Sequence, residues 1–275
     1  MPELPEVETI RCDLAPELTG RRIVAVRVHK PDIVLSPTSA QRLTRALAGE
    51  RIVEVSRRAK NLLFRLDSGR LLLTQVRMTG RFVLGPPLPA RSELKHVAAE
   101  FDLDDGRTLY YDDVRRLGGF TLLSEGEWSV REARLGPEPL EEDFTARLLA
   151  DRLSRSRAPI KSFLLDQRRI AGIGNIYASE ALHRAGVDPR RTAGSLKPLE
   201  VTRLHRAIRA VLRDALAGSG TTLRDYRAVN GRSGRFQNSL RAYGREGEPC
   251  RRCRSRVRRI VQAGRSTFYC SGCQS

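Results

Sequence analysis

The pattern of apolar and polar residues between about Arg21 and Leu123 is typical of β-strands. Apolar residues there alternate with polar ones or form short runs, as in segments 23–28 and 62–66. The turn sequences Asp67-Ser68-Gly69 and Asp104-Asp105-Gly106 lie between apolar runs, where hairpin connections are expected. The pattern therefore predicts a mostly antiparallel β-sandwich or barrel.

The apolar period becomes helical after the proline-rich sequence Gly136-Pro137-Glu138-Pro139. Apolar residues from Phe144 to Leu153 share one helical face, and Leu199 to Ala217 predicts a long amphipathic helix. The fold class that follows is α+β, with helices also flanking the sandwich. We place the domains at 1–135, 136–240 and 241–275.

The charge of the chain points to a polyanionic partner. The 275 residues include 50 Lys+Arg and 32 Asp+Glu, for a formal net charge of +18, and residues 224–275 alone hold 13 arginines, no lysine and three acids. Guanidinium groups suit bidentate contacts to phosphate, although a solvated basic face is the alternative. We expect no membrane association and a cytoplasmic location, because no apolar run is long enough to span a bilayer and the start is acidic.

Four of the five cysteines fall in a pattern that binds metal. Cys250-x2-Cys253 and Cys270-x2-Cys273 are separated by sixteen residues, the spacing by which two knuckles of a hairpin hold one zinc. A shell of four thiolates leaves no open position, so the zinc is expected to be structural. Two disulfides are the alternative reading. Cys12 stands alone in a predicted helix, where we expect a buried thiol.

The N-terminal sequence suggests a nucleophile. Removal of Met1 would expose the secondary amine of Pro2 beside the carboxyl of Glu3. An α-amino group has a pKa of roughly 7.7 to 8.0, so a useful fraction is neutral at pH 7. From the residues alone, an ordinary capped N-terminal helix starting near Pro5 is the alternative.

This stretch resembles the start of the bacterial formamidopyrimidine-DNA glycosylases, 8-oxoguanine repair enzymes that share a fold with endonuclease VIII. Further motifs follow in the family's order along nearly the whole chain. They are Arg57–Phe64, Val76–Gly80, Lys95-His96, Asp113–Gly118, Ile160-Lys161, Gly172–Glu180 and Gly264–Cys270. The resemblance implies a helix-two-turn-helix domain followed by a zinc-finger β-hairpin, and damaged double-stranded DNA as the partner.

The resemblance also assigns the site residues. The catalytic ones are Pro2, Glu3, Lys60 and Arg265, and the DNA-binding ones are Met78, His96, Arg115, Leu117, Arg157, Lys161 and Asn175. The amine of Pro2 would attack C1′ of a flipped nucleotide, with Glu3 as general acid. Met78 and Leu117 would wedge into the base stack. Many family members have an aromatic residue in place of Leu117. We assign Glu6 to support, and residues 218–234 to the segment that covers the everted base.

Three functions compete at this point. They are a bifunctional glycosylase and AP lyase for oxidised purines, a same-fold enzyme for oxidised pyrimidines, and a non-catalytic zinc-ribbon protein that binds DNA or RNA. The Pro2-Glu3 start argues against the third, and agreement at Met78 and Arg115 favours purines. We expect a bacterial, nucleoid-associated monomer. From the residues alone, core packing is favoured for Met78, and a lysine at a strand start is favoured for Lys60. Zinc ribbons also occur in ribosomal proteins and transcription factors, so the module alone does not identify an enzyme.

Overall fold

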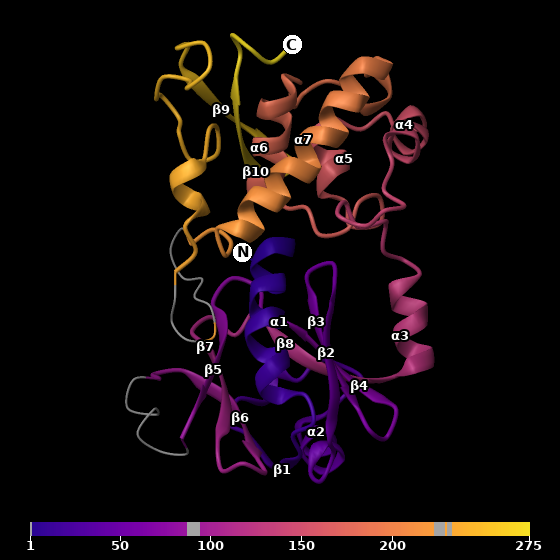
Figure 1. Cartoon of the computed structure of the whole chain (residues 1–275), viewed down its shortest axis with the longest axis vertical. Coiled ribbons are helices and arrows are strands. Elements are labelled where there is room, and N and C mark those ends of the chain that lie inside the picture. The colour runs from indigo at the N-terminus through magenta and orange to yellow at the C-terminus, as the bar shows by residue number, and fades with distance from the viewer. Residues whose placement is uncertain (1, 87–93, 223–228, 230–232) are drawn as a thin grey trace. The chain divides into compact units, whose positions relative to one another are not determined.

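The computed structural model describes residues 2–86, 94–222, 229 and 233–275 (Figure 1). The chain folds into two compact units. Unit 1 is formed by Met1–Ala133 and Gly218–Arg235, and unit 2 by Arg134–Ala217 and Phe236–Ser275. Within the described ranges, no helix combines the length and the apolar character that crossing a membrane requires.

Unit 1 contains two four-stranded antiparallel sheets, with strand orders β1-β6-β7-β5 and β2-β3-β4-β8. The strands are β1 (Ile23–Val28), β2 (Ile52–Arg58), β3 (Asn61–Leu66), β4 (Arg70–Gln75), β5 (Gly80–Gly85), β6 (Val97–Leu103), β7 (Thr108–Asp113) and β8 (Gly119–Ser124). The helices are α1 (Leu4–Leu18), α2 (Ala40–Leu47) and α3 (Glu125–Glu132). The predicted antiparallel sandwich with flanking helices is confirmed. Both predicted turns connect hairpins, with Gly69 and Gly106 at φ +77° and +81°.

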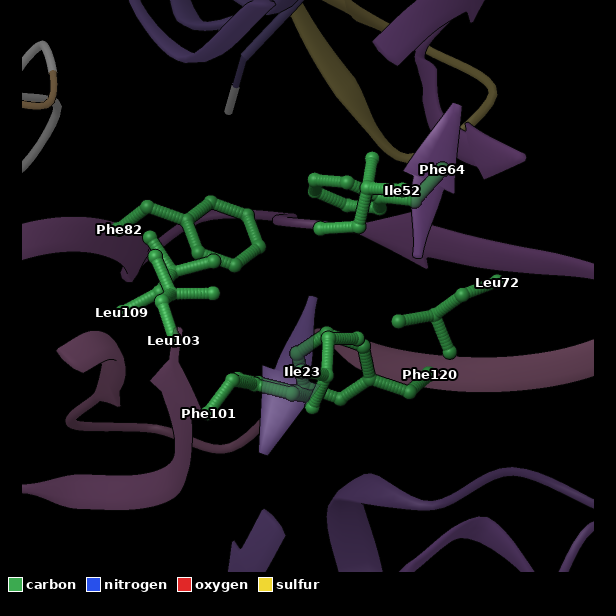
Figure 2. A pocket seen from close by; sticks show the side chains of 9 residues that line it. All are labelled: Ile23, Ile52, Phe64, Leu72, Phe82, Phe101, Leu103, Leu109 and Phe120. Atoms are coloured by element: carbon green, nitrogen blue, oxygen red, sulfur yellow. The ribbon is translucent and has the colours of Figure 1, made fainter. Parts of the chain in front are cut away.

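Aromatic rings from both sheets meet in the core of unit 1. Phe82 of β5 lies 6.0 Å from Phe64 of β3 and 6.3 Å from Phe120 of β8, measured between ring centroids. Nine apolar side chains line a cavity of about 10 Å³ at this place. Figure 2 shows how these side chains lie around it. An apolar cavity of that size offers no polar partner and barely the room for one water. It is a packing defect and not a ligand site.

Unit 2 is helical and ends in a hairpin. Its elements are α4 (Ala146–Ser154), α5 (Ile160–Leu165), α6 (Asn175–Ala185), α7 (Pro198–Ala217), β9 (Val257–Gln262) and β10 (Arg265–Cys270). The predicted helix over 199–217 is confirmed as α7. The predicted helical face starting at Phe144 is wrong at its first residue, because the Thr145 side chain caps α4 by accepting from the backbone N–H of Leu148. Phe144 instead stacks on His205, with 5.3 Å between the ring centroids.

The expectation that Cys12 is buried is also wrong. Cys12 lies in α1, as predicted, but its side chain is exposed. The buried face of α1 includes Ile10 and Leu14, four residues apart. A residue midway between two such positions points to the opposite side of a helix, because each residue turns the chain by about 100°. The pattern of α1 therefore explains the exposure.

Candidate functional site

The N-terminus of unit 1 buries the two residues to which the sequence assigns the chemistry. Pro2 and Glu3 are both buried, and only 2% of Glu3 is exposed. Glu3 is the N-cap of α1, with extended backbone at φ −107°. Pro5 follows in the first turn, where the missing N–H costs no helical hydrogen bond. The local sequence thus fixes the amine of Pro2 and the carboxyl of Glu3 at the positive end of a helix.

Glu6 joins this N-terminus to a segment more than 200 residues further on. One carboxylate oxygen of Glu6 accepts from the backbone N–H of Glu3 at 2.8 Å, and the other accepts from the backbone N–H of Thr221 at 2.7 Å. Gly220, at φ +80°, lies so close that a Cβ there would be 3.0 Å from the Glu6 side chain. The supporting role expected of Glu6 is therefore also a clamp on the start of segment 218–234. Residues 223–228 and 230–232 of that segment lie outside the described residues.

Substituting Glu6 is expected to loosen this clamp. Glu6→Ala leaves two buried N–H groups without their present acceptor, so we expect the free energy of unfolding to fall by roughly 2 to 6 kcal/mol. Urea denaturation measures the change. Glu17→Ala is the matched control at the exposed end of the same helix, where the ion pair with Arg107 is worth about 1 kcal/mol or less. Equal losses for the two variants would contradict the clamp.

Lys60 stands on the tight turn between β2 and β3. The turn residue Ala59 has φ +57°, and its carbonyl accepts from the Arg57 guanidinium at 2.9 Å. Arg57 in turn pairs with Glu8 of α1 at 2.9 Å. Burial raises the pKa of the Glu8 carboxyl, but hydrogen bonds from Arg11 and Arg57 outweigh this and hold the pKa below its ordinary value. The turn that carries Lys60 is thus tied to the helix that begins beside Pro2.

The predicted wedge residues, Met78 and Leu117, lie on two loops of unit 1, residues 76–79 and 114–118. Met78 and Leu117 are exposed by 39% and 47%, respectively, so both side chains are accessible to a partner. The Arg115 guanidinium lies 3.5 Å from the Met78 sulfur, so the two loops meet. Arg77 and Arg116, next to the wedge residues, have φ of +50° and +49°, a left-handed conformation that costs a non-glycine residue energy.

Asp113, the first residue of the Asp113–Gly118 motif, holds the two loops together, a role that the sequence does not indicate. Its buried carboxylate accepts from the Thr79 hydroxyl at 2.5 Å and from the backbone N–H groups of Arg115 and Gly118 at 3.2 and 3.0 Å. Burial, and then the charge of Asp113, raises the pKa of the Tyr111 hydroxyl, which donates to the same carboxylate. The wedge loops therefore rest on a fixed internal support.

His96 and Arg157 are both exposed, His96 in unit 1 and Arg157 in unit 2. The backbone of His96 is held by the carboxylate of Asp112, which accepts its N–H at 2.8 Å. Among the described residues, neither side chain makes a hydrogen bond or ion pair that would compete with a phosphate contact.

Lys161 and Asn175 are directed to the strand that begins at Arg265. The buried ammonium of Lys161 donates to the carbonyl of Ser266 at 3.1 Å and to the hydroxyl of Thr267 at 2.9 Å. Asn175, at the first position of α6, donates to the same Ser266 carbonyl at 3.0 Å. Arg265 itself is exposed. The ammonium of Lys161 thus faces β10 and 1% of the residue is exposed, while its contact with a DNA backbone stays a prediction.

The four cysteines of the finger converge as a zinc site requires. Their sulfur atoms all lie within 4.8 Å of one another, with Cys250 and Cys273 3.8 Å apart and Cys253 and Cys270 3.3 Å apart. A tetrahedron with zinc–sulfur bonds of about 2.3 Å has edges of roughly 3.8 Å. All four are free thiols. The donor set and its spacing fit one structural zinc ion.

Two residues of α6 support the finger and were given no role from the sequence. The Glu180 carboxylate accepts from three successive backbone N–H groups, those of Arg241, Ala242 and Tyr243, at 2.8 to 2.9 Å. The glutamate at the end of the Gly172–Glu180 motif was the signal in the sequence that could have pointed to this role. It anchors the chain just before the first cysteine knuckle.

His183 is the second of these residues. Its Nε2 atom lies 3.3 Å from the sulfur of Cys250, and 2% of the residue is exposed. Burial lowers the pKa of His183 to about 4, and repulsion from Arg241 and Arg252 acts in the same direction. Nothing in the sequence marks this residue, because a lone histidine in an amphipathic helix has no ligand spacing.

A β-sandwich with a buried Pro-Glu start and a helical unit that ends in a four-cysteine hairpin define the class of zinc-finger DNA glycosylases. Three family models match in order: the formamidopyrimidine-DNA glycosylase N-terminal domain over 1–120, its H2TH domain over 135–226, and the zinc finger found in FPG and IleRS over 247–275. The chain belongs to the formamidopyrimidine-DNA glycosylase family. The resemblance drawn from the motifs is confirmed.

Relatives and solved structures match over the full length. The formamidopyrimidine-DNA glycosylases of Chloroflexus aggregans and Ruegeria sp. are 47% and 45% identical and are covered to 98% and 100%, with all of this chain covered. The wild-type Lactococcus lactis Fpg in complex with N7-benzyl-Fapy-dG DNA has a TM-score of 0.91 at 35% identity, covering 100% of both chains. A complex of that enzyme with abasic-site DNA has a TM-score of 0.91 at 34% identity, covering 99% of both.

Proposed function

We propose that this chain is a bifunctional DNA glycosylase and AP lyase that removes oxidised purines, 8-oxoguanine and formamidopyrimidines, in base excision repair. The observation that carries the proposal is the buried Pro2-Glu3 pair at the start of α1 in a chain of this family. Two solved complexes of one relative, the Lactococcus lactis Fpg, contain N7-benzyl-Fapy-dG DNA and abasic-site DNA.

The chemistry begins at the amine of Pro2, once Met1 is removed. Its nitrogen lone pair forms a bond to C1′ while the bond from C1′ to the damaged base breaks, and the base leaves with that electron pair. The hydrogen of the Pro2 nitrogen is then lost as a proton, which the departing base takes up, so that the nitrogen lone pair can open the sugar ring. Glu3 protonates the ring oxygen as the deoxyribose opens, which leaves an iminium between the enzyme and the sugar. The iminium is an electron sink that acidifies the C2′ proton, so β- and then δ-elimination expel the phosphates on both sides.

The other site residues bind and deform the DNA. We assign the phosphates flanking the lesion to Lys60, which also assists proton transfer, and to Arg265. Met78 and Leu117 enter the stack of DNA bases, and Arg115 faces the orphaned base. The DNA backbone is contacted, directly or through supporting residues, by His96, Arg157, Lys161 and Asn175. For Lys161 to contact a DNA phosphate, its ammonium must give up its hydrogen bonds to Ser266 and Thr267 of β10.

The zinc ion, when bound to the four cysteines, supplies structure and no chemistry, because four thiolates complete its shell. The proposal also includes three domains, 1–135, 136–240 and 241–275, a monomer acting on damaged double-stranded DNA, and a location in the bacterial cytoplasm at the nucleoid.

Borohydride trapping tests the proposed function. We expect an untagged protein to form a covalent adduct with a duplex containing 8-oxoguanine, because borohydride reduces the iminium to a stable amine. Pro2→Gly is expected to lose the adduct, whereas Pro5→Ala, three residues away, keeps it. Mass spectrometry of the untagged protein checks that Met1 is absent. Preferential trapping on thymine glycol would move the enzyme to the oxidised pyrimidines, and no adduct on either duplex would refute the glycosylase.

A further inference from the structure

Helix α6 is attached to the metal site at its C-terminal end. Gly186, which follows the helix, accepts at its carbonyl from the backbone N–H of Ser275 at 3.2 Å, and Val187 accepts from the side chain of Gln274 at 2.8 Å. A Cβ on Gly186 would lie 3.2 Å from the carbonyl oxygen of Cys273. The end of α6 and the second cysteine knuckle are therefore in close backbone contact.

His183 lies in the last turn of this helix and points at the thiols. Its Nε2 atom is 3.3 Å from the sulfur of Cys250 and 3.9 Å from that of Cys273. Cys250 is completely buried, and its sulfur also lies 3.4 Å from the backbone N–H of Arg252. These distances are within the range of hydrogen bonds to sulfur.

The Cys250 thiolate determines which ring nitrogen of His183 carries the proton. A thiolate bound to a metal has lone pairs and no hydrogen, so it can only accept a hydrogen bond. The Nε2 atom of His183 must therefore be the donor towards Cys250. The other nitrogen, Nδ1, is buried without a hydrogen-bond partner among the described residues. The ring thus leaves one buried nitrogen unsatisfied, and its only polar contacts within the described chain are with the finger sulfurs.

We propose that His183 is a positioning residue of the zinc site, whose Nε2–H donates to the Cys250 thiolate, stabilises its charge and slows the loss of zinc. Such outer partners orient the ligands of a metal and commonly change its affinity by about 10- to 100-fold when they are removed. The inference depends on the four-cysteine site and not on which base the enzyme excises, so it stands or fails independently of the proposed glycosylase function.

The test compares zinc retention in variants at His183. His183→Phe keeps a ring of similar size but has no donor, so we expect zinc transfer to a chromogenic chelator to be at least about tenfold faster than in the wild type. His183→Gln restores an N–H donor and is expected to lie between the two. His205→Phe is the matched control, since His205 lies in the same unit and its ring contacts Phe144, whose carbonyl it bonds at 2.7 Å, and not the finger sulfurs.

Two further measurements separate a hydrogen bond from packing and from direct ligation. Alkylation of the zinc-loaded protein is expected to modify Cys250 faster in His183→Phe, because its sulfur loses the nearer donor contact. The rate at the exposed Cys253 is expected to stay unchanged, because His183 contacts the sulfurs of Cys250 and Cys273 and not that of Cys253. The ligand-field bands of the cobalt-substituted protein are expected to keep the pattern of four sulfurs in every variant. Wild-type zinc retention in His183→Phe, or cobalt bands that show a lost nitrogen ligand, would overturn the proposal. If His183→Phe does not fold, wild-type behaviour of His183→Leu would do the same.

Discussion

Glu3→Gln is expected to slow excision of 8-oxoguanine by roughly 10²- to 10⁴-fold, the usual contribution of a positioned general acid. Glutamine has the same shape and can still cap α1, but it has no proton to give to the ring oxygen of the sugar. Glu3 is 2% exposed, so water does not readily replace it. Single-turnover excision on a labelled duplex measures the change.

The same variant is expected to act on a preformed abasic site at a rate much closer to that of the wild type. An abasic deoxyribose already equilibrates with its open aldehyde, so ring opening needs less help from an acid. Glu17→Gln, at the exposed end of α1, is the control and is expected to leave both rates unchanged. A Glu3→Gln enzyme that excises the base at the wild-type rate would remove Glu3 from the mechanism.

Removal of zinc is expected to unfold the finger and to weaken DNA binding by about 100-fold or more. The hairpin of β9 and β10 has only two strands, and its own buried cluster consists of Cys250, Val257 and Cys270. Two strands are marginal in water, and structural zinc contributes on the order of 10 kcal/mol to such modules. Fluorescence anisotropy with a labelled duplex, before and after chelation, measures the loss.

The chain provides its own control for this experiment. Its single tryptophan, Trp128, is buried in α3 of unit 1, so its fluorescence reports on the sandwich and not on the finger. We expect that signal to remain while hydrogen exchange across 257–270 becomes fast. Protection of the hairpin without zinc would show that Lys161 and Asn175 hold β10 unaided.

The sequence predicted those parts of the fold and site that depend on local patterns. Alternating apolar residues, the turns at Gly69 and Gly106 and the cysteine spacing each follow from a short-range rule, and the structure has them. Contacts between residues far apart in the chain have no such short-range pattern in the sequence. The bond from Glu6 to Thr221 and the approach of His183 to Cys250 join residues whose proximity only the folded chain creates. Lys161 shows the same limit, since its motif did not reveal that the ammonium faces β10.

The hydrogen bond between Glu6 and Thr221 also limits how early unit 1 can complete its folding during synthesis. The chain emerges from the ribosome N-terminus first, and domains generally fold as units as they emerge. The strands of the sandwich are complete by Ser124, yet the clamp on its N-terminus needs a residue synthesised after the whole of Arg134–Ala217. The bond between Glu6 and Thr221 therefore cannot form in a nascent chain until the helical part of unit 2 has been translated.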